Sequence, residues 1–335
     1  NGSEWVQLGN EIKGEKLWDQ KGISLSLSGD GKTLAVGNPY SLDSSQTSAH
    51  GAVSVYSLEN QEWNSITNIE SDSLFDYFGY STNLSSDGKI LAVGGFYGAL
   101  GSATDNAGYV KIFENIDGNF TQIGDALTGD NLNADEFGFS IDLSSDGSVA
   151  AVSSAQGGDV FVYQRNGNNW SQLGDTIDFF DYSSDTKPSS IRKQEAVVQT
   201  KISEDGNYLA IGSPNVDVGG TNNGKIKVYQ NISNSWVQIG SDITGENLGH
   251  LGTFVDIEED NNGFLTLAAA GTTENSESYV NLYKLINSEW ISFVSIDSSD
   301  NQSFPTNSLD ISNDGSVLAI GTSHSPVNST NYDDN

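Results

Sequence analysis

Carboxylates are the most numerous side chains in this sequence that could do chemistry, and one short segment concentrates them. The segment Asp256-Ile-Glu-Glu-Asp-Asn-Asn-Gly263 places several acids around a turn that its glycine favours. If a strand runs up to that turn, Asp256 and Glu258 share a face, and Asp260 could complete a set of oxygen ligands. The segment predicts a cation site, with Ca²⁺ as the candidate ion; the alternative is an acidic hairpin solvated by water.

A second set of carboxylates recurs at one position of the chain. Asp19, Asp76 and Asp135 each lie three residues before a recurrent glycine. In a closed array of repeats, equivalent loops lie on one face, so these carboxylates would form a ring there. Such a ring would attract cations or a partner. Alternatively, the three aspartates only shape and solubilise their loops.

No arrangement typical of a catalytic centre stands out. The three histidines, His50, His250 and His324, show no metal-ligand spacing, and neither a Gly-x-Ser-x-Gly motif nor a phosphate-binding loop occurs. Carboxylate pairs are so numerous that none can be singled out as acid and base. We therefore expect a protein that is not an enzyme. The alternative is a polysaccharide hydrolase or lyase that uses carboxylates at a central channel.

The elements that must position these side chains are repeats. The segment Phe137-Gly-Phe-Ser-Ile-Asp-Leu-Ser-Ser-Asp-Gly-Ser-Val-Ala-Ala-Val152 returns in recognisable form along the whole chain. The steps between its turn glycines are 57, 59, 59, 57 and 52 residues, and the glycines are Gly31, Gly88, Gly147, Gly206, Gly263 and Gly315. A period of about 58 residues indicates one domain over residues 1–335, built as an array.

Each repeat divides into four short runs with strand character. The first alternates apolar and polar residues and ends in Ser-x-Asp-Gly, which favours a tight hairpin. A run such as Leu91-Ala-Val-Gly94 follows, then one such as Tyr109-Val-Lys-Ile-Phe113, then one led by an aromatic residue, such as Trp170-Ser-Gln-Leu-Gly174. Four antiparallel strands per repeat predict an all-β fold, a β-propeller with one blade per repeat.

The ends of the chain decide the predicted number of blades. Five full repeats lie between the termini, Leu309 to Gly321 supplies two strands of a sixth, and Trp5 to Gly9 supplies a fourth strand. The first and last segments would then share one blade of a six-bladed ring; a seven-bladed ring, which needs one more repeat, is the alternative. The third strand of the shared blade would come from residues 327–333, from a continuation of the chain, or from a neighbouring subunit.

Some recurrent motifs carry a family resemblance. Phe78-Gly-Tyr-Ser, Phe137-Gly-Phe-Ser, Val36-Gly-Asn-Pro39 and Ile211-Gly-Ser-Pro214 resemble the FG-GAP repeats of integrin-alpha-type β-propellers. The likeness spans nearly the whole chain and implies that fold, but it implies little about function. That family carries an Asp-x-Asp-x-Asp-Gly calcium loop in hairpins that here contain Ser85-Ser-Asp-Gly88 and its equivalents. Because the leading carboxylates are missing, we expect structural turns there.

Composition restricts the partners and the location. Acidic residues number 45 and basic residues 14, so the net charge is -31, which disfavours nucleic acid and anionic lipid as partners. No apolar run approaches the roughly 18 residues of a membrane helix, so we expect no membrane insertion. Such acidity suits a salty exterior, where ions screen self-repulsion. We therefore expect an extracellular or cell-surface location, while the absence of cysteine leaves the redox compartment open. The sequence has no methionine, and it opens within the repeat pattern, so we expect a piece of a longer polypeptide.

Three glycosylation sequons recur at one place in the repeat. Asn119, Asn169 and Asn231 lie at or beside the expected turn between third and fourth strands. An exposed position of this kind predicts N-glycosylation if the source is eukaryotic.

Together these patterns predict a non-catalytic binding or adhesion module. It would present the variable loops Asn38 to His50, Gly95 to Gly108 and Ser213 to Gly224 to a protein or glycan partner, as part of a surface appendage. The alternative in another class is a structural subunit of an extracellular filament or array, which self-associates through the incomplete terminal blade.

Overall fold

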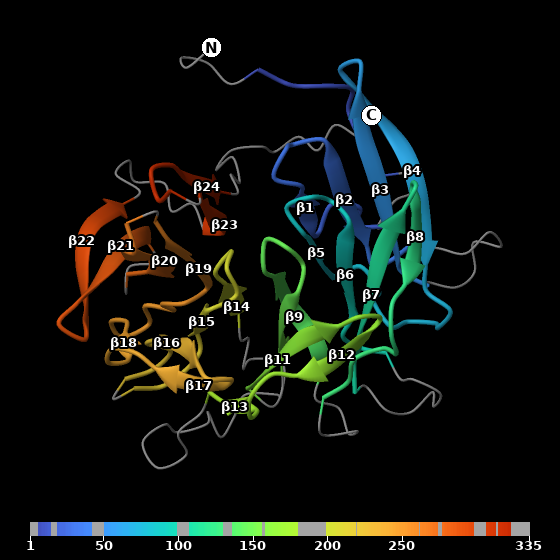
Figure 1. Ribbon diagram of the computed structural model, residues 1–335. Helices are drawn as coiled ribbons and strands as arrows, with labels where there is room; N and C mark the ends of the chain where they lie inside the picture. The colour runs from blue at the N-terminus through green and yellow to red at the C-terminus, as the bar shows by residue number, and fades with distance from the viewer. Residues whose placement is uncertain are drawn as a thin grey trace.

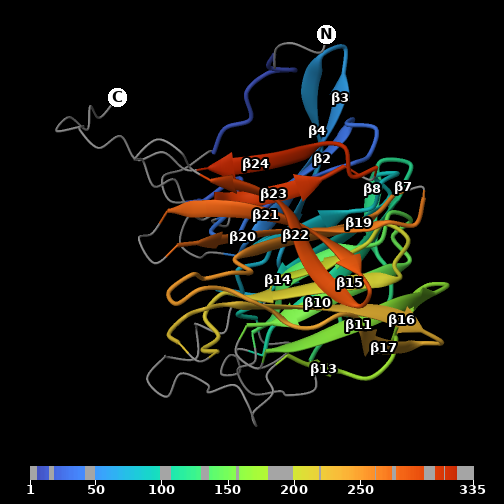
Figure 2. The same ribbon diagram turned by 90° about the vertical axis from the view of Figure 1, so that its left-hand side faces the viewer.

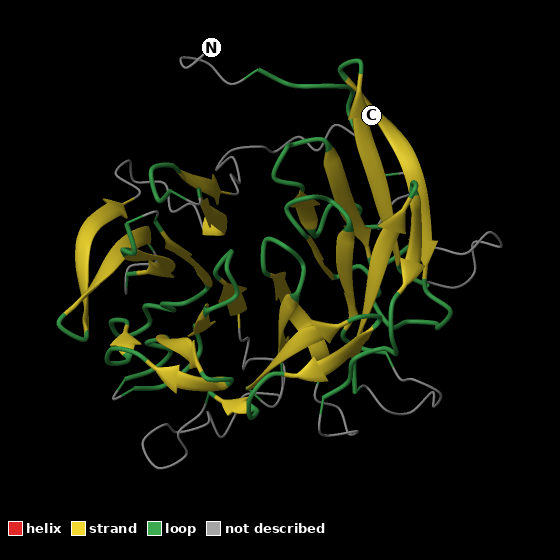
Figure 3. Cartoon of the chain, in the orientation of Figure 1, coloured by secondary structure: helices red, strands yellow, loops and turns green. Residues whose placement is uncertain are grey.

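The structure is a computed structural model of the 335-residue chain. It describes all residues except 1–5, 15–18, 42–49, 99–106, 130–135, 156–157, 180–198, 219, 261, 274–276, 298–305, 313 and 323–335. The described residues form 24 strands and no helix, so none of them belongs to a helix that could span a membrane (Figure 3). The all-β prediction is confirmed.

Strands pair antiparallel with their neighbours in sequence, which gives sheets of four consecutive strands. The first sheet contains β1 (Leu25–Leu27), β2 (Thr33–Asn38), β3 (Ala52–Glu59) and β4 (Glu62–Glu70). The second contains β5 (Ser81–Leu84), β6 (Ile90–Gly95), β7 (Tyr109–Ile116) and β8 (Asn119–Gln122). The third contains β9 (Phe137–Leu143), β10 (Val149–Ser154), β11 (Asp159–Asn166) and β12 (Asn169–Gln172), and β13 (Ile177–Asp178) also pairs with β11.

The second half of the chain repeats this pattern. The fourth sheet contains β14 (Gln199–Ile202), β15 (Tyr208–Ser213), β16 (Lys225–Ile232) and β17 (Ser235–Gln238), and β18 (Ile243–Thr244) pairs with β16. The fifth contains β19 (Phe254–Glu259), β20 (Leu265–Thr272), β21 (Ser278–Ile286) and β22 (Glu289–Asp297). The sixth contains β23 (Thr306–Ile311) and β24 (Leu318–Thr322).

The sheets stand around a common centre, with the first strand of each sheet innermost (Figure 1), and Figure 2 shows the same arrangement from the side. Consecutive inner strands contact one another from β1 through β5, β9, β14 and β19 to β23. The apolar core lies between adjacent sheets: Ala92 and Ile112 of the second sheet pack with Ile141 and Phe161 of the third. Burial of both faces of each middle strand explains the small and branched residues there, such as Leu91, whose exposed fraction is 0%.

Antiparallel connectivity gives the ring two distinct faces. We call the end with the connections from second to third strand, and from fourth strand to the next sheet, the loop face. The opposite end carries the hairpins from first to second and from third to fourth strand, and we call it the turn face. All three variable loops singled out from the sequence therefore belong to the loop face, and only parts of them lie among the described residues.

The Phe-Gly-x-Ser motif joins neighbouring blades. Ser81 Oγ donates to the carbonyl oxygen of Gly138 (2.7 Å), and Ser24 Oγ donates in the same way to Gly79 (2.9 Å). Gly79 has φ +91°, and a Cβ atom there would lie 2.3 Å from the carbonyl oxygen of Ala52. Only glycine allows this approach. The motif therefore recurs because each blade docks on the next through it.

A second contact between blades lies at the perimeter. The indole N–H of Trp236 donates to the carbonyl oxygen of Leu173 (3.0 Å), and that of Trp290 donates to Ile239 (3.1 Å). In both cases the acceptor follows the fourth strand of the preceding sheet. Trp63 of the first sheet donates to Leu8 in the same way (3.2 Å). Leu8 thus occupies the place that the residue after a preceding blade's fourth strand fills elsewhere. The described residues 6–9 form no strand, so the fourth strand predicted for Trp5 to Gly9 is not found there.

Candidate functional site

The Ser-x-Asp-Gly segments form hairpin turns on the turn face, and their side chains satisfy the turns themselves. Ser85 Oγ donates to the carboxylate of Asp87 (2.8 Å), which also accepts the backbone N–H of Lys89 (2.9 Å). Ser85 Oγ in turn accepts the N–H of Ile90 (2.9 Å). Gly88 supplies the positive φ of +68°. These bonds agree with the structural role expected from the missing calcium ligands.

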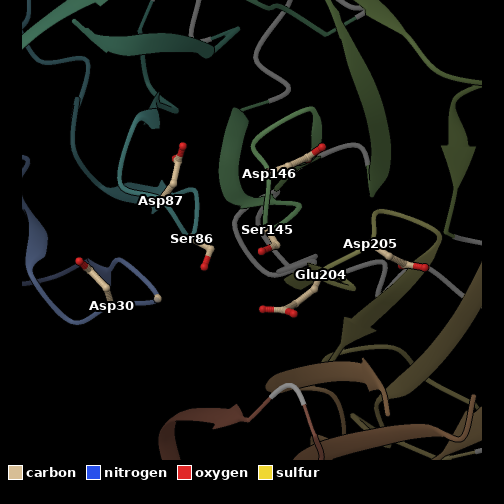
Figure 4. A pocket seen from close by; sticks show the side chains of 8 residues that line it. Asp30, Ser86, Asp87, Ser145, Asp146, Glu204 and Asp205 are labelled. Atoms are coloured by element: carbon tan, nitrogen blue, oxygen red, sulfur yellow. The ribbon is translucent and has the colours of Figure 1, made fainter. Parts of the chain in front are cut away.

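The turns also bond to one another around the axis. The N–H of Gly29 donates to the carbonyl oxygen of Ser86, that of Ser86 to Ser145, and that of Ser145 to Glu204, each at 2.8 Å. They line an open cavity of about 770 Å³. Glu204 points into this cavity, while the carboxylates of Asp146 and Asp205 point away from it (Figure 4). Because those aspartates cap their own turns, the cavity does not gather them into one ligand set.

Deeper along the axis, six inner-strand side chains form what we call the polar ring. Each occupies the register position that pairs with an alanine of the second strand. Its members are Ser26, Asn83, Asp142, Lys201, Asp256 and Asp310. The first strands are the inner edges of their sheets. Their N–H groups that point away from the second strand therefore need partners other than strands.

The polar ring supplies those partners from blade to blade. Ser26 Oγ accepts the N–H of Leu84 (2.8 Å), and Asn83 Oδ1 accepts the N–H of Leu143 (3.2 Å). The carboxylates of Asp142 and Asp256 accept N–H groups of the next blade in the same way, from Ile202 (2.8 Å) and Ile311 (2.6 Å). The polar ring therefore links successive blades by side-chain hydrogen bonds that recur from blade to blade.

Lys201 breaks this pattern because an ammonium group has no lone pair to accept with. Its Nζ lies 3.4 Å from the carboxylate of Asp142 and 4.0 Å from that of Asp256. These carboxylates raise the pKa of Lys201, Asp142 most strongly. The N–H of Ile257, left without an acceptor on Lys201, donates instead to Asp256 (3.0 Å). One cation thus contacts two carboxylates, one from the blade before its own and one from the blade after it.

Burial shifts the acids around Lys201. It raises the pKa of Asp142 to about 6, against the opposing effect of Lys201. Burial, with the charges of Asp256 and Glu204, raises the pKa of Glu258 to about 8. The pKa of Asp310 is raised as well, chiefly by burial. The centre therefore contains acids that share one lysine, and Glu258 is protonated at neutral pH.

The structure separates the three residues of the predicted cation site. Asp256 and Glu258 share one face of β19, as strand alternation predicts, and both point toward neighbouring blades. Asp260 is the turn residue, and its carboxylate accepts the N–H groups of Asn262 and Phe264. At about 3.3 Å per residue, Asp256 and Asp260 lie roughly 13 Å apart along the strand. Among the described residues, no group of three or more His, Asp or Glu side chains is arranged to hold a metal ion.

The expected acidic ring on the loop face is only partly described. Asp135 lies outside the described residues, whereas Asp19 and Asp76 are buried, with exposed fractions of 8% and 0%. Asp19 accepts the N–H of Lys21 (3.1 Å). Asp76 accepts bonds from the hydroxyls of Ser71 and Tyr109 and from the N–H of Phe78. These two carboxylates shape their own loops, which is the alternative that the sequence left open.

Asp76 holds its loop, so we expect its loss to be costly. Replacing Asp76 by alanine would leave the N–H of Phe78 and the hydroxyls of Ser71 and Tyr109 buried without that acceptor, a loss of about 2–3 kcal/mol in the free energy of unfolding. Urea denaturation would measure it. Asp72, whose side chain is 93% exposed in the same loop, is the matched control, and Asp72→Ala should change stability by less than about 0.5 kcal/mol. Equal effects of the two substitutions would contradict this role.

The three sequon asparagines lie at the third hairpin of their sheets, as expected. Asn119 begins β8 and Asn169 begins β12, both exposed on the turn face, and Asn231 lies near the end of β16. The side chain of Asn231 accepts the N–H of Asn234 (3.0 Å). Glycosylation of these asparagines stays a prediction.

The loop face carries a feature that the sequence analysis missed. Six aromatic rings from the first three sheets contact one another there, all of them partly exposed, and we call them the aromatic platform. They are Tyr40, Tyr77, Tyr80, Phe96, Tyr97 and Phe139. Aromatic residues at successive positions of the loops, such as Phe96 and Tyr97, were the available signal. To predict that these rings converge, one must know which loops meet in the folded chain.

The loop containing Tyr77 presents its aromatic side chain by a backbone shape that recurs. Tyr77 has φ +56°, and the equivalent residues Gln20, Glu136 and His250 also have positive φ, between +43° and +56°. The conformation thus belongs to the repeat, and the side chain placed there differs from blade to blade. Among these four described repeats, the second places a tyrosine there, and the others place glutamine, glutamate and histidine.

Comparison with known proteins bears on the fold alone. No family model and no curated protein matches the chain. A putative 6-phosphogluconolactonase from Bacteroides uniformis is similar in structure, with a TM-score of 0.58 and 12% identity over 89% of this chain and 77% of its own. Kuenenia stuttgartiensis hydrazine synthase has a TM-score of 0.56 and 14% identity over 95% of this chain and 77% of its own. The β-propeller domain of Myceliophteria thermophila Cps50 has a TM-score of 0.53 and 12% identity over 89% of this chain and 79% of its own.

Radial four-stranded sheets with their first strands innermost, together with this likeness, define the protein as a β-propeller. At such identities the neighbours' activities do not transfer, because this fold hosts many unrelated functions.

Proposed function

We propose that the protein is a non-catalytic binding or adhesion module that engages its partner through the loop face. The aromatic platform carries this proposal. Partly exposed aromatic rings gathered from three blades are the kind of surface that binding sites use, since aromatic residues are enriched at interfaces. Buried Asp76 supports one of the platform's loops, which keeps Tyr77 and its neighbours in place.

The ionisable groups at the axis favour binding over hydrolysis. Asp142 and Asp256 already accept backbone N–H groups and contact Lys201, so neither is poised toward a substrate. Glu258, with a pKa of about 8, and Glu204 remain the best acid and base candidates for the alternative, a polysaccharide hydrolase or lyase.

We further propose an extracellular or cell-surface location and kinship with FG-GAP-type propellers. The net charge of -31 supports the first, and the docking role of Phe-Gly-x-Ser between blades supports the second. A ring of six blades is supported by Leu8, which receives the indole of Trp63 as a fourth strand of the last sheet would. The third strand of that sheet is expected from residues 327–333, from a continuation of the chain or from a neighbouring subunit, and residues 327–333 lie outside the described part.

The test of this proposal compares variants on the loop face and on the turn face. The full chain is applied to panels of glycans and extracellular-matrix proteins, alongside Tyr77→Gln on the loop face and Glu204→Gln on the turn face. Binding that falls at least tenfold in Tyr77→Gln and persists in Glu204→Gln is the expected result. Turnover of a polysaccharide that Glu204→Gln or Glu258→Gln abolishes would instead establish an enzyme, and absence of any binding by the chain would overturn the proposal.

The filament alternative rests on the sixth sheet. Within the described residues β24 pairs only with β23, whereas the second strand of every other sheet has a strand on both sides. An unpaired edge is a template for another chain. Electron microscopy of the native material would distinguish a regular array from separate discs, and discs that stay monomeric at high concentration would exclude this alternative.

A further inference from the structure

We propose that the aromatic platform binds cationic groups, the ammonium or guanidinium side chains of a protein partner, by placing them against its ring faces. The inference rests on the proposed function of the loop face and specifies the chemistry of its partner. It follows from the geometry of the rings, the charge around them and the way in which this protein uses its own lysines.

The rings present both faces and edges. Tyr77 stacks on Phe96 with centroids 5.4 Å apart and planes 17° apart, which makes a flat centre. Tyr40 lies edge-on to Tyr77 (4.9 Å, 61°), and Phe139 lies edge-on to Phe96 (5.7 Å, 84°). Rings at steep angles to one another can contact one cation from two directions, as in sites for quaternary ammonium groups.

Charge on this side of the molecule favours a cation. A ring face is electrically negative, and the net charge of -31 adds a field of the same sign. Asp72 lies in the loop that carries Tyr77, but its carboxylate already pairs with Lys111 (3.3 Å). The local negative charge comes from Glu136, whose charge contributes to the raised pKa of Tyr80, after burial and Tyr40. Burial and a hydrogen bond with Tyr40 raise the pKa of Tyr77 to about 12, so its hydroxyl stays neutral and can accept a hydrogen bond from an ammonium group.

Elsewhere the protein places its own lysines over aromatic rings. Lys227 lies 5.2 Å from the ring centre of Phe179, Lys284 lies 5.0 Å from that of Phe293, and Lys21 lies 5.6 Å from that of Tyr56. Across the described part of the chain, no lysine or arginine lies over a ring of the platform. Within the described residues the platform thus lacks the lysine that Tyr56, Phe179 and Phe293 have over their rings, and an external cation can supply that contact.

Two probes of equal shape separate charge from apolar contact. Choline carries a quaternary ammonium group, and 3,3-dimethylbutan-1-ol replaces its nitrogen by carbon and has no charge. Calorimetric titration of the full chain should show choline binding at least tenfold more tightly than the alcohol. A pentalysine peptide should bind more tightly than choline because it occupies several ring faces at once.

Substitutions borrowed from other repeats test the location without disturbing the fold. Tyr77→Gln and Phe96→Ala install the residues that Gln20 and Ala155 supply at the equivalent positions. Each should weaken choline and pentalysine binding at least fivefold. Phe264→Leu removes an exposed ring on the turn face, 60% exposed, and should leave binding unchanged.

Four results would overturn the proposal. Equal affinity for choline and the alcohol would show apolar contact only. Binding that the platform variants leave intact would show attraction by the overall negative charge, and saturation by a neutral oligosaccharide with no choline binding would assign the platform to glycans. If binding of a partner found in the glycan and matrix panels still depends on Tyr77 while choline does not bind at all, the loop-face function stands and the cationic chemistry is wrong.

Discussion

Replacing Lys201 by methionine is expected to lower the free energy of unfolding by about 3 kcal/mol at pH 7, the largest effect of any conservative change at the centre. Methionine keeps most of the side chain's length but removes the one cation that, among the described residues, contacts both Asp142 and Asp256. Those carboxylates are 6% and 4% exposed, and without Lys201 they would lie unneutralised on the two blades that flank the blade of Lys201. Urea denaturation followed by tryptophan fluorescence would measure the loss.

Two controls separate lost charge from lost packing. Adding Asp142→Asn to Lys201→Met should recover at least half of the loss, because the amide keeps a carbonyl oxygen for the N–H of Ile202 and removes one unpaired charge. Lowering the pH to 5 should also narrow the difference between wild type and Lys201→Met, because Asp142, with a pKa of about 6, becomes protonated. A loss that neither change reduces would contradict the electrostatic role of Lys201.

The second large effect is a dependence of stability on pH that originates at Glu258. Its pKa of about 8 lies well above the usual value near 4.3, so the folded state binds this proton over a range in which the unfolded state has released it. The free energy of unfolding therefore falls as pH rises from about 4.5 to 8, and is flat beyond. After allowance for partial exposure, we expect a decrease of about 2 kcal/mol from this group. Lys201, with a raised pKa, contributes no slope in that range.

Glu258→Gln tests this account, because glutamine imitates the protonated acid at every pH. The variant should match wild type at pH 5 and exceed its stability by about 2 kcal/mol at pH 8. Self-repulsion of the acidic surface also weakens wild type at high pH, so both proteins are compared at low and high salt. The difference at half-buried Glu258 should depend on salt less than this surface effect does. Identical pH profiles for the two proteins would contradict the assignment.

The repeat made the fold predictable, and the outcome shows why. The Ser-x-Asp-Gly and Phe-Gly-x-Ser motifs are short, and each indicates one local structure. Both recur with the period of the repeat. The structure adds their second role, which the chain itself does not display: the same Ser81 that follows the Phe-Gly pair bonds to Gly138 in the next blade. Such contacts join residues about one repeat apart, which explains why the period is kept.

The candidate site was predicted less well, for a different reason. Asp76 was singled out by position, and its burial was not foreseen because the hydroxyls of Ser71 and Tyr109 that surround it come from different parts of the repeat. Nothing in the sequence distinguishes Lys201 from the other basic residues, and only the register of β14 places it between two carboxylates. The aromatic platform combines loops of three blades, and loop convergence has no pattern in sequence.

The most direct measurement of the central claim is an NMR titration of the aromatic rings with pentalysine, at an ionic strength that screens distant charges. If the loop face binds cations through the platform, ring resonances of Tyr40, Tyr77 and Phe96 shift together and saturate, while those of Phe264 on the turn face stay still. Shifts spread over all exposed rings, or confined to the turn face, would contradict the account.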